Sequence, residues 1–476
     1  MTGEAIDADI CVIGAGAGGL SVAAGAAQLG QRVVLVERDL MGGDCLNHGC
    51  VPSKALLAAA AAAQAARDAR RFGVEAGPVR VDRAALRAHV QGVIDAIAPH
   101  DSQERFEGLG VTVLRAHARF RDRASIEAGG HVVRARRFVV ATGSRPAIPP
   151  VPGLADLPYL TNETIFAVEE APRRLLVLGG GPIGCELGQA HRRLGSEVAI
   201  LEAARLCGRE DPELVEVLRA RLRAEGVVLH EGARVVAARR AGEGVALRIV
   251  GADGMEEEIE GSHLLVATGR RPALDDLGLE RAGVEHDARG IRVDAGLRSS
   301  NPRIHAIGDA AGGAQFTHLA GHHAGIFVRR ALFRLPARAD AAAIPRVTYT
   351  DPEIAWVGMT GEEAHAAGLA PRILRAPFST NDRARAERDD EGLVKVVAGA
   401  RGRILGAGIA GARAGDLLQP WILAIAKRLS LRDMAGLVLP YPTRGEASKR
   451  AASSYFADAL FSPRTRRLVR WLSRLG

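Results

Sequence analysis

Two cysteines stand close together near the start of this chain. Residues 42–54 read GGDCLNHGCVPSK, which places Cys45 and Cys50 at the beginning of an expected helix and beside Lys54. A helix N-terminus and a neighbouring cation favour the thiolate, and together they can lower a thiol pKa from about 8.5 into the range of roughly 3.5 to 7.5. Two thiols at this spacing can cycle between dithiol and disulfide. The segment therefore predicts a redox-active pair.

The cysteine count supports this interpretation. Five cysteines among 476 residues are too few for a secreted disulfide framework. A metal site would need further cysteines or paired histidines at suitable spacing, and the sequence near the pair has none. Cys11, Cys185 and Cys207 stand singly, and we expect them to be small buried residues.

A glycine-rich turn precedes the cysteine pair. Residues 9–37, DICVIGAGAGGLSVAAGAAQLGQRVVLVE, predict a strand, a turn, a helix and a second strand that ends at Glu37. Gly14 permits the tight turn, Gly16 lets a pyrophosphate approach the backbone, and Gly19 lets the helix pack on the strand. The helix N-terminus would face the phosphates, and Glu37 would accept a ribose hydroxyl. The full pattern is a far stronger signal than the glycines alone.

The same pattern recurs at residues 175–202, LLVLGGGPIGCELGQAHRRLGSEVAILE, so two nucleotide cofactors are predicted. Glu202 would repel a 2′-phosphate, which favours NADH over NADPH. Arg205 and Arg209 lie close enough in sequence to weaken that preference, so NADPH stays possible. The glycines of this second turn are Gly179, Gly181 and Gly184.

Three further segments predict contacts with the nucleotides. ATGSRP (141–146) and ATGRRP (267–272) each end a strand in a glycine turn, and IHAIGDAA (304–311) places Asp309 after another strand. Asp309 could meet a ribityl or phosphate group, or it could cap a helix. A helix starting near Thr317 could aim its positive end at a reduced flavin. The additional candidates for a flavin site are Gly43, Thr142, Gly143 and Asp309, and Gly269 is the candidate for the nicotinamide nucleotide.

Taken together and in this order, the motifs resemble the flavoprotein disulfide reductases, or class I pyridine nucleotide-disulfide oxidoreductases, along essentially the whole chain. The resemblance implies an α/β fold with two Rossmann-like dinucleotide-binding domains plus a C-terminal α+β dimerisation domain, assembled as a homodimer with shared active sites. The implied divisions are an FAD-binding domain at 1–150, an NAD(P)-binding domain at 151–275, a central domain completing the FAD site at 276–345, a dimerisation domain at 346–462, and a basic amphipathic tail at 463–476.

The resemblance also implies roles for individual residues. Cys50 matches the thiol that lies against the flavin, and Cys45 matches the interchange thiol that attacks substrate. Lys54 matches the lysine near the flavin, and Glu186 matches its carboxylate partner. FAD and NADH are therefore the expected cofactors, and the chain is expected to be an NAD(P)H-dependent oxidoreductase.

The C-terminal half looks most like mercuric reductase, which is a member of this family. The segments that carry this likeness are REDPE (209–213), VTYTDPEIAWVG (347–358) and LPYPTRGE (439–446). Members that reduce disulfides have a His in the last segment and a Glu five residues later, whereas this chain has Tyr441 and Glu446. A tyrosine, with an unperturbed pKa of about 10, is a poor base at neutral pH. Hg(II) or another soft metal ion is therefore the expected acceptor.

Three departures from mercuric reductase keep alternatives open. No cysteine follows Cys207, although those enzymes carry a late vicinal pair, and no N-terminal metal-binding domain is recognised. Asp44 stands where the family commonly has Thr. The first alternative is a dihydrolipoyl dehydrogenase-like or other disulfide reductase with a different proton carrier, for which His318 would be the first choice. The second is a membrane-associated redox interaction protein or quinone reductase.

The tail and the composition suggest where the protein works. Residues 463–476, PRTRRLVRWLSRLG, place Leu468, Trp471, Leu472 and Leu475 on one helix face. Such a helix can pack on the protein's own dimerisation domain, which we expect, or lie on an anionic membrane surface.

No signal peptide or membrane-spanning run is recognised, so we expect a cytoplasmic protein. The charge of +8 forms no zinc-finger, RRM or basic-stripe pattern, so no nucleic-acid partner is expected.

Overall fold

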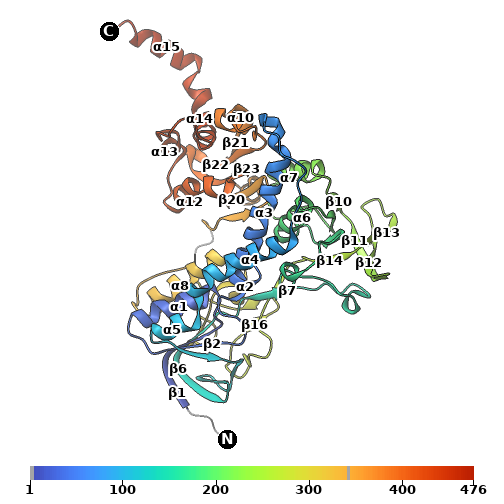
Figure 1. Cartoon of the computed structure of the whole chain (residues 1–476). Helices are drawn as coiled ribbons and strands as arrows, with labels where there is room; N and C mark the ends of the chain where they lie inside the picture. The colour runs from blue at the N-terminus through green and yellow to red at the C-terminus, as the bar shows by residue number, and fades with distance from the viewer. Residues whose placement is uncertain (1–4, 340–342, 476) are drawn as a thin grey trace. The chain divides into compact units, whose positions relative to one another are not determined.

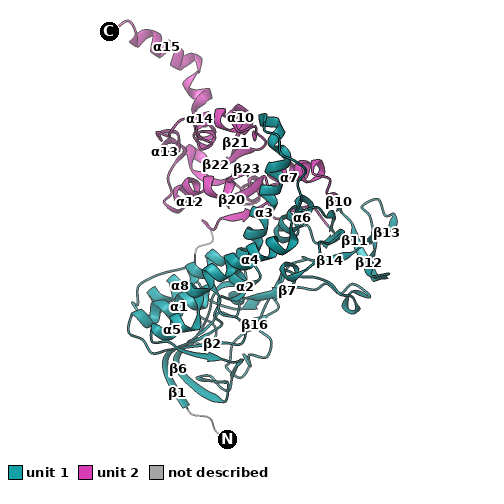
Figure 2. Ribbon diagram, in the orientation of Figure 1, with its two compact units in different colours: residues 1–203, 230–340 teal, residues 204–229, 341–476 magenta. Residues whose placement is uncertain are grey.

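Two compact units make up the chain in this computed structural model, which describes residues 5–339 and 343–475 (Figure 1). The first unit contains residues 1–203 and 230–340, and the second contains residues 204–229 and 341–476 (Figure 2). Across the described residues, no helix has both the length and the apolar character needed to cross a membrane.

The larger sheet of the first unit is built on the first glycine-rich motif. Strand β1 (Ala5–Ile13), helix α1 (Ala17–Gln28) and strand β2 (Val33–Glu37) form a parallel unit in which Ile10 pairs with Val33 and Ile13 with Val36. β2 is buried along its whole length, as is typical of parallel strands covered on both faces. The strand order is β3-β2-β1-β6-β5-β4, with β18 also paired to β6. The other strands are β3 (Thr112–Arg115), β4 (Ala118–Phe120), β5 (Ser125–Ala128), β6 (His131–Val140) and β18 (Ile304–Ala306).

Helices surround this sheet and carry the cysteine segment. α1 packs on α8 (Thr317–Ala331), and α3 (Cys50–Asp68) packs on both α4 (Arg83–Ile97) and α6 (Pro182–Arg193). The short helices α2 (Gly43–Asn47) and α5 (Gln103–Gly108) complete the set. The packing of α3 on α6 joins the cysteine segment to the helix of the second glycine-rich motif.

The second motif forms its own parallel sheet in the same unit. Strands β8 (Arg174–Leu178) and β9 (Glu197–Glu202) flank α6, and β14 (His263–Val266) pairs with β8 on its other side. The two Rossmann-like units of the expected α/β fold are thus confirmed. Shorter strands complete the unit: β7 (Ser144–Pro146) with β15 (Arg270–Pro272), the sheet of β11 (Arg234–Ala241), β12 (Gly244–Val250) and β13 (Glu256–Gly261), and the pair β16 (His286–Asp287) and β17 (Gly290–Ile291). Strand β10 (Val228–Glu231) spans the boundary between the two units in sequence.

The second unit is an antiparallel sheet with helices, as expected for the α+β domain. Its strand order is β19-β20-β23-β22-β21, and its core includes the fully buried Trp421 and Phe378. The strands are β19 (Arg346–Thr348), β20 (Glu353–Gly358), β21 (Arg372–Pro377), β22 (Leu393–Ala398) and β23 (Ile404–Gly411). The helices are α7 (Pro212–Ala224), α9 (Gly361–Ala366), α10 (Asp382–Ala386), α11 (Ala414–Leu417), α12 (Gln419–Ala426), α13 (Leu431–Ala435), α14 (Glu446–Leu460) and α15 (Pro463–Leu472).

A buried cation ties α7 to this sheet. Lys395 on β22 lies 2.8 Å from carboxylate oxygens of both Asp211 and Glu213, and its side chain is only 10% exposed. Although residues 204–229 follow β9 directly in sequence, they cluster with the second unit. The domain boundaries expected near residues 150, 275, 345 and 462 stay predictions.

Replacing Lys395 should destabilise the second unit strongly. Lys395→Met keeps most of the side-chain volume but leaves the buried Asp211 carboxylate without its cation, which costs roughly 3–5 kcal/mol. Glu213 keeps its ion pair with Arg375. We expect this loss in the free energy of unfolding from urea titrations. Lys427→Met, at an exposed lysine, is the matched control and should change it by less than about 0.5 kcal/mol. Equal effects of the two substitutions would contradict the role assigned to Lys395.

Candidate active site

The cysteine segment is held against the first glycine-rich turn by close backbone contact. Gly42 and Gly43 have φ angles of 87° and 61°, which glycine adopts readily. A side chain on Gly43 would collide with the backbone of Gly16, and Gly16 and Gly42 form an isolated β-bridge. The structure therefore brings Gly43, a predicted flavin contact, next to the first turn and sets the start of α2 beside it.

The two thiols differ sharply in their acidity. Cys45 and Cys50 are both free thiols here, and Cys50 is the first residue of the 19-residue helix α3. The hydrogen bond with Cys45 lowers the pKa of Cys50 to about 6, helped by Thr317 and the charge of Lys54. That same hydrogen bond, with burial, raises the pKa of Cys45. The Cys50 Sγ lies 3.3 Å from the Thr317 Oγ1 at the start of α8. At neutral pH the pair holds one thiolate, on Cys50.

Lys54 and Glu186 meet as the resemblance implies. The Lys54 Nζ donates to the Glu186 Oε2 at 2.8 Å, and the Glu186 side chain is buried. The two residues come from α3 and α6, so this ion pair links the helix of the cysteines to the helix of the second glycine-rich motif. It also holds a positive charge one helical turn from Cys50.

The first glycine-rich turn has the shape that a dinucleotide requires. A Cβ on Gly14 would strike the Ala141 backbone, and one on Gly19 would strike the Gly14 carbonyl. At Gly16, by contrast, nothing lies within 4 Å of the added atom, which leaves room for a pyrophosphate. The Glu37 Oε2 accepts the Ala15 amide at 2.6 Å and thereby braces the turn.

Residues from the neighbouring strand ends also fit a bound flavin nucleotide. The hydroxyl of Thr142 is buried and has no hydrogen-bond partner among the described residues. Gly143 has a φ of 68° and open space around its missing side chain. Asp309 does not cap a helix: its Oδ2 accepts the Ser144 hydroxyl at 2.5 Å, and burial raises its pKa. An unpartnered hydroxyl beside an open glycine turn is what a ligand-binding cradle requires, so these residues fit FAD.

The second turn repeats this geometry. Added side chains would collide at Gly179 and Gly184 with the Ala267 carbonyl and the Gly179 carbonyl, whereas Gly181 faces open space. The Glu202 Oε2 accepts the Gly180 amide at 2.8 Å, the counterpart of the bond made by Glu37. Gly269 has a φ of 134° with nothing within 4 Å of an added Cβ. This turn therefore also fits a dinucleotide.

An anchoring network around Asp44 was missed by sequence reasoning. The Asp44 carboxylate lies 3.2 Å from the guanidinium of Arg270 and accepts the Asn162 amide at 3.0 Å. Arg270 in turn donates to the Ser144 hydroxyl at 2.8 Å. The network joins the cysteine segment to Asp309 through residues far apart in sequence. Arg270 lies in the ATGRRP segment, but nothing in that segment identifies Asp44 as its partner.

Tyr441 and Glu446 lie in the second unit. Tyr441 is 71% exposed, and its hydroxyl donates to the Asp382 Oδ2 at 3.0 Å. This hydrogen bond to a carboxylate raises the pKa of Tyr441. The Glu446 Oε2 accepts the Thr443 amide at 3.3 Å. Tyr441 is thus protonated at neutral pH, and the catalytic roles of both residues stay predictions.

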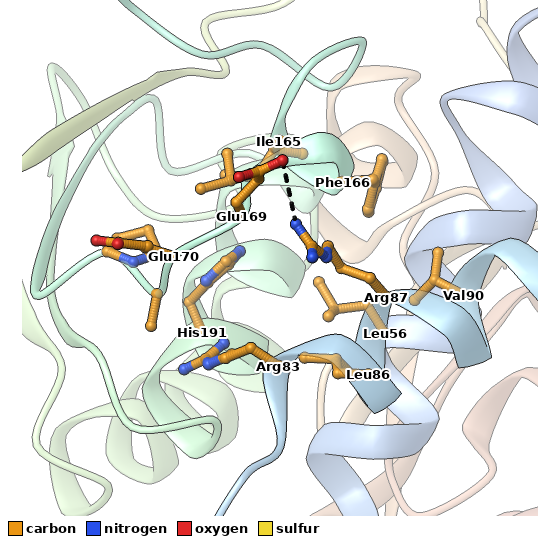
Figure 3. Close-up of a pocket in the computed structure, with 13 residues that line it drawn as sticks. Leu56, Arg83, Leu86, Arg87, Val90, Ile165, Phe166, Glu169, Glu170 and His191 are labelled. Carbon is orange, nitrogen blue, oxygen red and sulfur yellow. Dashed lines mark ion pairs between the residues drawn. The ribbon is translucent and has the colours of Figure 1, made fainter.

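A small cavity in the first unit lies apart from these groups (Figure 3). It is lined by residues of α3, α4 and α6 and by the segment 165–172, and Arg87 and Glu169 approach to 3.8 Å at one side. Burial lowers the pKa of His191, which also lines it, to about 4. The lining includes Leu56 of α3 but neither cysteine and none of the predicted nucleotide contacts.

Comparison with known proteins gives two family matches. Residues 8–324 match the pyridine nucleotide-disulphide oxidoreductase model, and residues 344–452 match the dimerisation domain of the same family. The chain is 37% identical to mercuric reductase of Streptomyces lividans over 94% of its length and 96% of that protein. It is 38% identical to dihydrolipoyl dehydrogenase of Thermus scotoductus, over 95% and 98% of the two chains.

Solved structures show the same architecture. LpdA from Mycobacterium tuberculosis has a TM-score of 0.86 and 26% identity, covering 94% of this chain and 99% of that one. The Cu(II) complex of the HOCl-induced flavoprotein disulfide reductase RclA from Escherichia coli has a TM-score of 0.84 and 25% identity, covering 93% and 99%.

The unequal thiol acidities should be visible in alkylation rates. In the reduced protein, we expect the iodoacetamide reaction at Cys50 to reach half its maximal rate near pH 6, because its pKa is about 6. Cys45 should react fast only at alkaline pH. Cys45→Ala removes the hydrogen bond and should move the Cys50 midpoint upward, which mass spectrometry at each pH can follow. Equal midpoints for the two thiols would contradict the assignment.

Removing the charge of Asp44 should lower the pH midpoint of Cys50 alkylation, which is the opposite of the effect expected for Cys45→Ala. The Asp44 carboxylate raises the pKa of Cys50, so Asp44→Asn should lower the alkylation midpoint while keeping a side chain that fits the site. Asp156→Asn, at an exposed acid of the first unit, is the control and should leave the midpoint unchanged. An unchanged midpoint in Asp44→Asn would show that Arg270 already cancels this charge.

Proposed function

Because this chain belongs to the pyridine nucleotide-disulphide oxidoreductase family, we propose that it oxidises NADH and passes the electrons through Cys45 and Cys50 to Hg(II) or another soft metal ion. Members of this family are oxidoreductases, so the chain is an oxidoreductase. The family is FAD-dependent and uses pyridine nucleotides. When bound, FAD would supply the chemistry that carries hydride from a nicotinamide onward as two electrons to a cysteine pair.

The proposed roles follow from the geometry of the first unit. Gly14, Gly16, Gly19 and Thr142 would hold FAD, and Gly179, Gly181 and Gly184 would hold the nicotinamide nucleotide. Lys54 and Thr317 stabilise the Cys50 thiolate. By resemblance, Cys45 is the interchange thiol, and it would bind the acceptor. In the overall balance, NADH and Hg(II) give NAD⁺, Hg(0) and one proton.

The observation that carries the proposal is the state of Tyr441. Disulfide exchange with a small substrate needs a group that takes up and returns a thiol proton near neutral pH. Tyr441 occupies the position of that group by resemblance, and its hydrogen bond to Asp382 raises its pKa further. A soft metal ion binds to thiolates and needs no such base. Relatives named mercuric reductase and the Cu(II) complex of RclA support the same class of acceptor.

The proposed electron donor is NADH. NADH is favoured over NADPH because the Glu202 carboxylate would repel a 2′-phosphate. Arg205 already donates to the Gly208 and Glu210 carbonyls of its own loop, at 2.8 Å and 3.3 Å.

The match to the dimerisation domain indicates a homodimer, in which Tyr441 and Glu446 would serve the partner's site.

The test compares acceptors in the purified flavoprotein. We expect NADH oxidation with Hg(II) and excess thiol, and a loss of at least 100-fold in Cys45→Ser and Cys50→Ser. Cys11→Ala is the matched control, because burial keeps that thiol protonated and outside the reaction. Faster turnover with lipoamide than with Hg(II) would replace the metal acceptor with a disulfide. Quinone turnover that is indifferent to Cys45 would overturn the relay itself.

A further inference from the structure

The tail forms a separate, well-capped helix. The Ser462 hydroxyl accepts the Thr465 amide at 3.2 Å and Pro463 occupies the first turn, so α15 has a clear beginning. Residues 459–475 contain no acidic side chain and five arginines, namely Arg464, Arg466, Arg467, Arg470 and Arg474. Figure 1 shows α15 beyond the end of α14.

The two faces of α15 have opposite character. Leu468, Trp471, Leu472 and Leu475 lie within one arc of the helix, with Val469 at its edge. These five side chains are between 49% and 67% exposed, and no residue of α15 is buried. Arg466, Arg467, Arg470 and Arg474 share the opposite arc. A continuous stripe of exposed apolar side chains marks a contact surface.

Within the described chain, the second unit does not bury this stripe. Among the described residues, the core of the second unit is closed by side chains that precede α15, ending with Tyr455 and Phe456 of α14. The family dimerisation match ends at residue 452, before α15 begins. The packing of the tail on its own domain, expected from the sequence, is therefore not seen in the described chain.

We propose that α15 binds an anionic lipid surface, with Trp471 and the leucines at the level of the headgroups. The occupant is set by charge: five arginines without an acid repel a second copy of the same helix and attract anionic headgroups. Apolar insertion and this attraction together are what an interfacial helix requires. The flavoprotein would then work at a membrane surface without spanning it.

The experiment is cosedimentation of the full-length holoenzyme with lipid vesicles. We expect binding to vesicles of equal parts phosphatidylglycerol and phosphatidylcholine, weakening with added salt, and at least tenfold weaker binding to phosphatidylcholine alone. The apolar-face variant Trp471→Ser with Leu472→Ser, and the charge variant Arg466→Gln with Arg470→Gln, should each lose at least tenfold. NADH oxidation by the unbound variants should match that of the unaltered chain.

Matched control variants remove the same kinds of side chain at exposed positions outside α15. Met255→Ser with Val438→Ser removes two exposed apolar side chains, and Arg80→Gln with Arg240→Gln removes two exposed arginines. Both controls should change binding less than twofold. A loss in the controls equal to that in the α15 variants would overturn the proposal, because binding would then follow overall composition.

Tryptophan fluorescence reports insertion directly. Trp356 and Trp421 are fully buried, whereas Trp471 is 57% exposed, so iodide quenches mainly Trp471. Anionic vesicles should protect this emission from iodide. Absence of binding and of protection at low salt would overturn the proposal. So would dissociation of the dimer by the apolar-face variant without any effect on vesicles, which would make α15 a contact between subunits.

Discussion

The close approach of Gly43 to Gly16 governs where the chemistry of this protein can occur. A side chain at Gly43 is incompatible with this contact, because its Cβ would lie 2.7 Å from the Gly16 Cα. Since α2 begins at Gly43 and α3 begins at Cys50, the contact fixes the thiols beside the turn that fits a flavin nucleotide. The Lys54–Glu186 ion pair then couples this corner to the helix of the second turn.

Charge around the thiols is balanced by groups on four separate segments. The hydrogen bond from Cys45, the Thr317 hydroxyl and the Lys54 cation favour the Cys50 thiolate, while Asp44 opposes it. Arg270 lies 3.2 Å from the Asp44 carboxylate and forms an ion pair with it. The consequence is a pair in which one sulfur is anionic and the other protonated, as a directional relay requires.

The second unit contributes in a different way. Lys395 forms ion pairs that hold the start of α7 on the sheet. Tyr441 and α15 place exposed side chains on the surface of the same unit. A tyrosine that is hydrogen-bonded to a carboxylate is a weak base, and the proposed metal-ion acceptor rests on this. The proposed binding to an anionic lipid surface rests on the basic helix α15.

The sequence by itself determined whatever depends on local spacing. Both glycine turns, the cysteine pair and the amphipathic tail could be predicted because their residues lie within a few turns of one another, where backbone geometry dictates function. Tertiary structure alone decided the partners of Asp44, the hydrogen bond of Asp309 and the exposure of α15. Arg270 and Asn162 are more than 100 residues from Asp44 in sequence. Only packing brings such groups within hydrogen-bond distance, and no local pattern records it.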